Sequence, residues 1–437
     1  MSTALEPISV KAPSMAPRST RPAATANKLD DVMTLDSGKQ RTNDKGEEKP
    51  CLICISYFPD GKQMVEGSTN NSARRWDLQT GEEIVEARFT CEREVWAIAV
   101  SRDSRWVVTG GGDRDHINGP GELKAREVET GVMKTFEGHS AAVSCVDISV
   151  DTKLLASGSW DHTARIWDLN TGKLVAGPFE SSGLVGAVRF SQDSKKLAVK
   201  GGVYGRLLEV WDIQEQKLDR RVGIAGGGTL HDSPVFWTTK DRSIIAALTV
   251  DGYDNPTNIY EFDPSTLETV GAPFEGHTGE IRGIALSLDC ALLASSSDYD
   301  STIKLWAFES RQLLASFDVH IDIHTLILSP NSRQLAYTTF DPSRIHICDI
   351  PPDILARIWP EQVTCRVYIL TAYIYLLGTN SSCRLNVRAA LTHSTYAILS
   401  FCPSISLIIH LYCSLIQLVI LLPCAVTKCH GLQPSDR

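Results

Sequence analysis

The 437-residue chain lacks the patterns that usually indicate metal, redox or phosphate-binding sites. Cys51 and Cys54 have the spacing of a metal or redox pair, but no second pair accompanies them and they lie within an apolar stretch. The glycine runs at 109–113 and 225–229 are not followed by the lysine and hydroxyl residue of a phosphate loop. We therefore interpret these segments as core strand and turns, and we expect no metal site, no cofactor and no catalytic residues.

Basic residues are scarce in the first 350 positions. The chain has 43 Lys and Arg against 52 Asp and Glu, a net charge of −9, and residues 351–437 contain six of the basic and three of the acidic residues. The body of the chain is therefore more acidic than the whole. Such a body argues against a nucleic-acid binder that follows phosphates, and it suits a basic protein partner.

The sequence does not open with an apolar signal segment. Its 12 cysteines are scattered, with six before residue 350 and six after residue 360. We therefore expect reduced thiols in an intracellular protein, cytoplasmic or nuclear. Residues 1–31 are rich in Ser, Thr, Ala and Pro and have little to bury, so they are predicted to be disordered.

Helical periodicity is absent beyond residue 50, and the chain instead repeats short alternating strands with a period of about 40–50 residues. Seven stretches align at the end of a third strand, at Trp76, Arg126, Trp167, Trp211, Tyr260, Trp306 and Cys348. This pattern predicts a β-propeller of seven four-stranded blades. Val32 to Leu35 is expected to supply the fourth strand of the last blade, which would close the ring and remove an open edge.

Two kinds of motif in these repeats carry a family resemblance. EGH occurs at 137–139 and 275–277, and Trp-Asp pairs occur at 76–77, 167–168 and 211–212. On these motifs the chain resembles the WD40-repeat β-propellers over about residues 32–350. The resemblance implies an all-β fold with a seven-bladed propeller at residues 32–352, between the disordered N-terminal segment and an anomalous apolar C-terminal tail.

In the WD40 family a hydrogen-bond relay joins the third-strand tryptophan, through a serine, to the Gly-His histidine and a turn aspartate. The resemblance implies two such relays, formed by His139, Ser157, Asp161 and Trp167 in blade three and by His277, Ser295, Asp300 and Trp306 in blade six. Buried polar groups joined in this way satisfy one another. Each histidine could instead be a catalytic base or a metal ligand. Blade two lacks these relay residues and is expected to be the irregular blade.

Four consecutive blades place an aromatic residue just before the turn-aspartate position, namely Trp160, Tyr204, Tyr253 and Tyr299. The resemblance puts this position on the top face of the propeller, beside the central channel. The same face is expected to include Glu94, Trp96, Glu280, Arg282, Asp322 and Asp341. Aromatic anchors with acidic neighbours favour a Lys or Arg side chain. The alternative is that the aromatic residues only pack each turn against the adjacent blade.

The tail, residues 353–437, differs from the rest of the chain. Residues 362–435 contain no acidic residue, and the run 404–426 has 23 uncharged residues, enough to span a bilayer. Two interpretations remain open. The run is a C-terminal membrane anchor, or the tail is translated non-coding or frame-shifted sequence, a gene-model artefact.

These features predict a non-catalytic scaffold or adaptor that binds protein partners, with a basic peptide segment on the aromatic and acidic top face. No nucleic-acid partner is expected and no oligomer is implied. A propeller tethered to a membrane by residues 404–426 is the alternative. An enzyme with a site in the central pocket is a third possibility that the sequence favours less.

Overall fold

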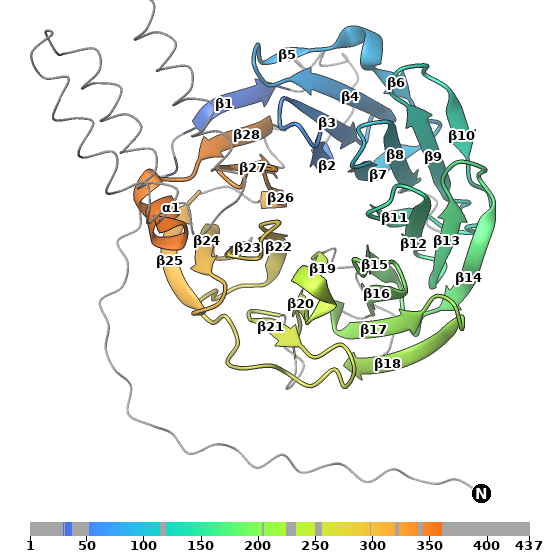
Figure 1. Cartoon of the computed structure of the whole chain (residues 1–437). Helices are drawn as coiled ribbons and strands as arrows, with labels where there is room; N and C mark the ends of the chain where they lie inside the picture. The colour runs from blue at the N-terminus through green and yellow to red at the C-terminus, as the bar shows by residue number, and fades with distance from the viewer. Residues whose placement is uncertain are drawn as a thin grey trace, which may run out of the picture. The chain divides into compact units, whose positions relative to one another are not determined.

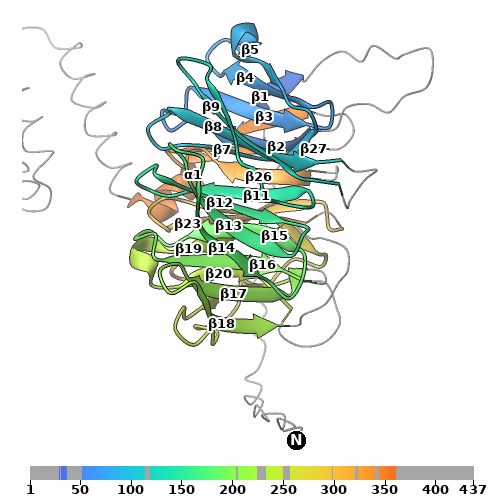
Figure 2. The same cartoon turned by 90° about the vertical axis from the view of Figure 1, so that its right-hand side faces the viewer.

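The computed structural model describes residues 29, 31–36, 52–113, 119–202, 205–223, 233–249, 256–297, 299–319, 323–339 and 344–360. Within them, seven antiparallel sheets follow one another around a ring (Figure 1). Each sheet is one blade, and the first strand of each blade lies innermost. Figure 2 views the same ring from its side. The structure confirms the seven-bladed propeller that the repeats predicted.

The first three blades each run from an inner strand to an outer edge. Blade one contains β2 (Leu52–Tyr57), β3 (Gln63–Ser68), β4 (Ser72–Asp77), β5 (Glu82–Glu83), the 3₁₀ helix η1 (Val85–Ala87) and β6 (Phe89–Thr90). Blade two contains β7 (Glu94–Val100), β8 (Trp106–Gly112), β9 (Glu122–Glu127) and β10 (Met133–Thr135). Blade three contains β11 (Val143–Ile148), β12 (Leu154–Ser159), β13 (Thr163–Asp168) and β14 (Leu174–Glu180).

The remaining blades complete the ring. Blade four contains β15 (Val185–Phe190), β16 (Lys196–Gly201), β17 (Leu207–Asp212) and β18 (Lys217–Gly223). Blade five contains β19 (Val235–Trp237), the 3₁₀ helix η3 (Thr239–Asp241), β20 (Ile244–Ala247) and β21 (Ile259–Phe262). Blade six contains β22 (Ile281–Leu286), β23 (Leu292–Ser297), β24 (Thr302–Ala307) and β25 (Gln312–Asp318). Blade seven contains β26 (Ile323–Leu328), β27 (Gln334–Thr339), β28 (Arg344–Asp349) and β1 (Asp31–Asp36).

The ring is closed by the first strand of the chain. β1 pairs antiparallel with β28, so that Leu35 lies opposite Ile345. Leu35 is fully buried and packs into an apolar cluster with residues of blades seven and one. The Asp31 carboxylate accepts a hydrogen bond from Nδ1 of His346 at 2.8 Å. The closing strand predicted at Val32 to Leu35 is therefore confirmed, and it begins one residue earlier than expected.

The apolar core lies between neighbouring blades. Ala164 and Ile166 of blade three pack against Val188 and Leu197 of blade four, and all four are buried. Similar clusters join blade two to three, four to five and five to six. Because each fully buried Val, Leu or Ile side chain contributes about 1.5–3 kcal/mol, the blades stabilise one another through these faces.

Blade two is regular, and among the described residues blade five has the fewest strands. Blade two forms four paired strands, whereas the described part of blade five forms three, followed by isolated bridges at Phe274 and Thr269. The expectation for blade two was wrong because strand pairing depends on backbone hydrogen bonds and apolar alternation, which β7 to β9 retain without the relay residues. In blade five, Pro264 and Pro273 cannot donate to a ladder along the outer edge.

A short helix follows the last strand of the propeller. α1 (Pro352–Ile358) buries Ile354, and Nη1 of Arg357 donates to the carbonyl of Leu314 in β25 at 3.2 Å. The first residues of the predicted tail therefore pack on blade six. Residues 1–28 and the apolar run 404–426 lie outside the described residues. In the part of the chain that is described, no helix has the length and apolar character needed to cross a membrane.

Candidate functional site on the top face

A hydrogen-bonded relay of four side chains lies at the top of blade three. Nε1 of Trp167 donates to Oγ of Ser157 at 2.9 Å, and that hydroxyl lies 2.8 Å from Nε2 of His139. Nδ1 of His139 lies 2.8 Å from the Asp161 carboxylate. Because an indole only donates and an ionised carboxylate only accepts, the network assigns Ser157 as donor to Nε2 and Nδ1–H as donor to Asp161. The structure thus brings together the four residues named from the sequence.

Blade six repeats the arrangement. Nε1 of Trp306 donates to Oγ of Ser295 at 2.9 Å, His277 lies 2.7 Å from the same hydroxyl, and His277 Nδ1 lies 2.8 Å from Asp300. In both blades a threonine two residues after the aspartate also donates to it, Thr163 at 2.6 Å and Thr302 at 2.7 Å. Sequence analysis missed these threonines, although both occupy the same position after the turn aspartate.

Burial and hydrogen bonding in the relays shift the pKa values of Asp161, Asp300 and His277. Burial opposes ionisation of Asp161, but the hydrogen bond from His139 and those from Thr163 and the Ser140 amide hold its pKa well below the usual range. The pKa of Asp300 is lowered in the same way by His277 and Thr302, again against burial. Burial lowers the pKa of His277, and the attraction of Asp300 offsets only part of this effect. The blade-six relay is therefore favoured with neutral His277 and ionised Asp300.

The order Ser, His, Asp also occurs in catalytic triads, so accessibility decides how these relays act. Ser157 and Ser295 are fully buried, and each hydroxyl accepts a hydrogen bond from an indole. The side chains of His139 and His277 are each 1% exposed. A substrate cannot reach either hydroxyl in this arrangement, and the relays act as structural supports for the turns above them.

In blades one and two, some of the relay positions carry different residues. The register of β3 and β4 puts Glu66 where blade three has Ser157, and the register of β8 and β9 puts Arg126 where it has Trp167. The Glu66 carboxylate is fully buried, with Nε of Arg74 at 3.7 Å. Burial raises the pKa of Glu66 to about 7, and the charge of Arg74 only partly opposes this. Blades one and two therefore lack the complete relay seen in blades three and six.

Two tryptophans meet on the top face across a blade boundary. Trp160 lies in the turn between β12 and β13, and Trp96 lies in β7 of the adjacent blade. Their ring centroids are 4.7 Å apart with an interplanar angle of 51°, and both side chains are half-buried. Nε1 of Trp96 donates to the carboxylate of Glu94 at 2.9 Å. Among the described residues, no acceptor lies within hydrogen-bond distance of the buried Nε1 of Trp160.

Tyr299 presents a third aromatic ring to solvent. It lies in the turn between β23 and β24 and is 71% exposed. A side chain at Gly279 would bring its Cβ within 2.4 Å of the Tyr299 Cβ, so the close approach of these two segments requires glycine. The Tyr299 side chain is therefore accessible to a partner, in the turn next to the blade-six relay.

The other residues expected on the top face are either less accessible to a partner or outside the described residues. Glu280, just before β22, is only 1% exposed, and Arg282 in β22 is half-buried. Tyr204, Tyr253, Asp322 and Asp341 lie outside the described residues. Of the ten residues expected on this face, Glu94, Trp96 and Trp160 form one contiguous cluster and Tyr299 is strongly exposed.

The described residues contain neither a cluster that could hold a metal ion nor a disulfide bond. No group of three or more His, Cys, Asp or Glu side chains among the described residues is arranged to hold a metal ion. Five described cysteines form no disulfide bond, namely Cys54, Cys91, Cys145, Cys290 and Cys348. Burial raises the pKa of Cys91 to about 11, so this thiol is protonated at neutral pH.

The family model for the WD domain, G-beta repeat, matches three segments of the chain. They are residues 86–115, 131–168 and 268–307. The second and third segments begin on the outer part of one blade and end with the third strand of the next, so they contain the two relays. The motif in the sequence thus coincides with the hydrogen-bonded unit in the structure.

Several curated proteins are similar to this chain. Periodic tryptophan protein 2 of Arabidopsis thaliana is 28% identical over 216 residues, which cover 49% of this chain and 22% of the relative. Subunit I of eukaryotic translation initiation factor 3 from Culex quinquefasciatus is 26% identical over 210 residues, 45% of this chain and 61% of the relative. The small ribosomal subunit protein RACK1 of Candida albicans is 29% identical over 243 residues, 55% of this chain and 68% of the relative.

The chain spans less than two thirds of the length of the first two of these relatives. The names of the second and third relatives place those proteins in assemblies, an initiation factor and a ribosomal subunit. The matches to the repeat model, the seven blades and the two relays all indicate the same fold. In its matched segments the chain is similar to WD40-repeat proteins, and its described residues form a seven-bladed β-propeller.

Proposed function

We propose that this chain is a non-catalytic scaffold whose top face binds a basic peptide segment of a protein partner. The observation that carries the proposal is the cluster of Glu94, Trp96 and Trp160, together with exposed Tyr299. The buried relay hydroxyls support a non-catalytic role, because the best nucleophile candidates are inaccessible. The relatives that are subunits of assemblies favour the same role for this chain.

The chemistry of the cluster favours a cation. A Lys or Arg side chain over an indole face gains about 0.5–2 kcal/mol, depending on how far the pair is removed from water. The Glu94 carboxylate beside Trp96 adds a negative charge at the same place. The N–H of Trp160, which has no acceptor among the described residues, is a donor for a peptide carbonyl if the ring turns on binding.

The test is retention of short peptide libraries on the immobilised full-length protein. One library has Lys or Arg at its fixed centre and a second has Gln there, with random flanking residues in both. We expect the basic library to be retained over the Gln library, and expect Trp160→Ala and Glu94→Gln to reduce that retention several-fold. Tyr299→Ala tests the exposed ring without disturbing the core, because its side chain is 71% exposed.

Leu288→Ala is the matched control. Leu288 is 70% exposed in the turn between β22 and β23, at the opposite end of blade six from Tyr299. Loss of binding in the aromatic variants, with Leu288→Ala unchanged and all circular dichroism spectra alike, would support the top face. Equal retention of the basic and Gln libraries would overturn the proposal, and the aromatic residues would then only pack the turns.

A further inference from the structure

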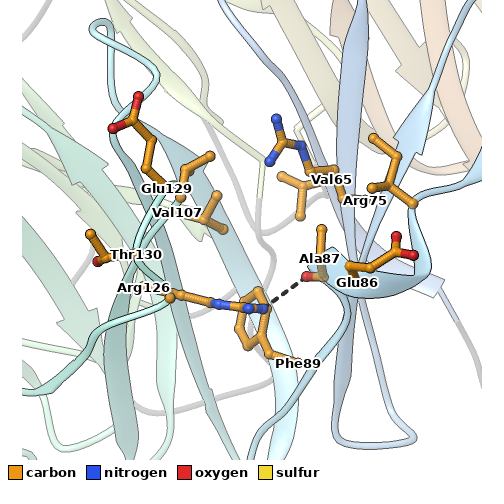
Figure 3. Close-up of a pocket in the computed structure, with 12 residues that line it drawn as sticks. Val65, Arg75, Glu86, Ala87, Phe89, Val107, Arg126, Glu129 and Thr130 are labelled. Atoms are coloured by element: carbon orange, nitrogen blue, oxygen red, sulfur yellow. Dashed lines mark hydrogen bonds between the residues drawn. The ribbon is translucent and has the colours of Figure 1, made fainter.

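A pocket opens on the propeller between blades one and two, away from the top-face cluster. Its volume is about 360 Å³, and it is lined by β3, β4, β8, β9, the η1 segment and the turn that follows β9. Figure 3 shows Val65, Arg75, Phe89, Val107, Arg126 and Glu129 around it. Neither the proposed function nor the relays account for this pocket.

Blade two has Arg126 at the position of the third-strand tryptophan, and this arginine lines the pocket. Nη1 of Arg126 donates to the carbonyl of Ala87 at 2.9 Å and to that of Arg88 at 3.3 Å. Figure 3 shows the side chain reaching across from β9 toward Ala87. Its guanidinium carbon lies 5.2 Å from the centre of the Phe89 ring. Among the described residues, Nε and Nη2 of Arg126 have no acceptor.

A second guanidinium lines the same pocket. Nε of Arg75 donates to Oε1 of Gln63 at 2.7 Å, and Nη2 donates to the same oxygen. Its guanidinium carbon lies 4.3 Å from the centre of the Phe58 ring. In the described part of the chain, Nη1 of Arg75 has no acceptor. Both arginines therefore rest a planar face on an aromatic ring and keep N–H groups for another acceptor.

The two guanidinium groups of the pocket have no direct ion-pair partner. Within the described residues, no carboxylate lies within ion-pair distance of Arg75 or Arg126. Burial lowers the pKa of Arg75, distant Asp60 opposes this, and the charge of Arg126 lowers it further. A ligand anion would relieve the repulsion between these arginines and use the remaining donors.

The mouth of the pocket combines negative charge with exposed apolar side chains. Glu86 and Glu129 line it and are exposed. Val85 is 64% exposed beside Glu86, while Val132 and Met133, 51% and 40% exposed, follow directly after the lining residue Gly131. Large exposed apolar residues around a charged pocket are typical of protein-binding surfaces.

We propose that this pocket binds the carboxylate of an Asp or Glu side chain in a partner segment, with apolar flanking residues of that segment resting on Val85 and Val132. The carboxylate would accept from the remaining N–H groups of Arg126 and Arg75, the geometry in which guanidinium groups bind planar anions. The site lies in different blades from the Tyr299 turn and takes a ligand of opposite charge from that of the top face.

Glu86 and Glu129 favour a carboxylate over a phosphate group. A phosphorylated side chain carries nearly two negative charges at neutral pH, and both glutamates would repel it at the mouth. A carboxylate carries one charge and meets less repulsion. The proposal is therefore an acidic segment, and a phosphorylated segment is an outcome of the test.

The experiment uses short peptide libraries on the immobilised full-length protein, with random flanking residues and a fixed centre of Glu or Asp, of Gln or Asn, or of phosphoserine. We expect the Glu or Asp library to be retained most strongly. Arg126→Gln should reduce that retention at least about tenfold, because a hydrogen bond to a charged group is lost. Arg220→Gln, which removes an exposed arginine from β18 of blade four, is the matched control.

A second pair of variants keeps the test valid if Arg126→Gln perturbs the blade. Glu86→Gln and Glu129→Gln change exposed side chains and should raise retention of the acidic library about two- to fivefold each. The proposal is supported if retention of the acidic library falls in the arginine variant and rises in the glutamate variants. The proposal is overturned if the acidic library is retained no better than the Gln library, or if its retention is the same in every variant. Stronger retention of phosphoserine with the same arginine dependence overturns the assignment to a carboxylate.

The top-face variants separate this site from the basic-peptide site. Trp160→Ala should leave retention of the acidic library unchanged, since Trp160 is not among the residues that line the pocket. If Trp160→Ala and Arg126→Gln reduced binding of the same library, the two surfaces would form one site. The proposal of a separate acidic-peptide pocket would then be wrong.

Discussion

Trp96 and Trp160 belong to adjacent blades, and their indole rings lie 4.7 Å apart on the top face of the propeller. The amide of Trp160 also donates to the carbonyl of Ala142 at 3.0 Å, at the start of the first strand of its own blade. A tryptophan in this turn thus links two blades as well as presenting a ring to solvent. Packing and binding are compatible roles for the same residue.

This pair should be energetically coupled. We expect Trp96→Ala and Trp160→Ala to destabilise less in combination than the sum of the single changes, with a coupling of about 0.5–1.5 kcal/mol. Urea unfolding of both single variants and the double variant measures this coupling. Additivity within about 0.3 kcal/mol would show that the rings do not support each other.

Removing a relay serine should cost more than removing an exposed one. Ser157→Ala leaves the Trp167 indole N–H and Nε2 of His139 without their partner, and we expect a loss of about 1–3 kcal/mol in the free energy of unfolding. Ser295→Ala should have a similar effect in blade six. Ser140→Ala, an exposed position in the same loop as His139, is the control, and an equal loss there would contradict the relay model.

The propeller should lose stability on acidification in two stages. The pKa of His277 is lowered on folding, so its contribution is complete above the ordinary value of 6.5 and falls as the pH drops below it. The pKa values of Asp161 and Asp300 are lowered as well, so their contributions are complete above 3.8 and are lost below it.

Thermal unfolding across this pH range tests the assignment. The combined Asp161→Asn and Asp300→Asn variant should be less stable at neutral pH and should show a smaller further loss below the ordinary carboxyl pKa. A parallel loss in both proteins would mean that other carboxyl groups control the acid transition.

Glu66 should destabilise the fold at alkaline pH. Its pKa rises from 4.5 to about 7 on folding, so its protonated form contributes stability below 4.5 that is lost as the pH rises through 7. Glu66→Gln should therefore raise the free energy of unfolding by about 2–3 kcal/mol at alkaline pH, with little change under acid conditions. Chemical unfolding at several pH values measures this effect. Glu86→Gln, at an exposed site, should show none, and a pH-independent effect of Glu66→Gln would refute the explanation.

The fold was predictable because its signals are local and repeated. All seven third-strand ends named from the sequence lie in third strands, from Trp76 in β4 to Cys348 in β28. The two relays were expected from the resemblance to WD40 repeats, and the structure joins Ser157 and Trp167 on paired strands of one hairpin. A regular spacing along the chain therefore specifies the blades.

Features that depend on two blades at once were not predictable. Glu280 was expected at the surface from its alignment, yet its surroundings bury it almost completely. Arg126 was noted only as a missing tryptophan, although its contact with Ala87 and Phe89 of the preceding blade forms a pocket. Such outcomes depend on which side chains face each other between sheets, and no periodicity in one strand encodes that information.

The pairing of β1 with β28 has a consequence for biosynthesis. Asp31 and Cys348 are in contact although 317 positions separate them, so a ribosome makes one edge of the seventh blade long before its partner strand. Contacts of such long sequence separation form slowly. Until they form, the nascent chain exposes the unpaired edge of β1 and the apolar surface of Leu35, and chaperone capture is most valuable to the protein during this interval.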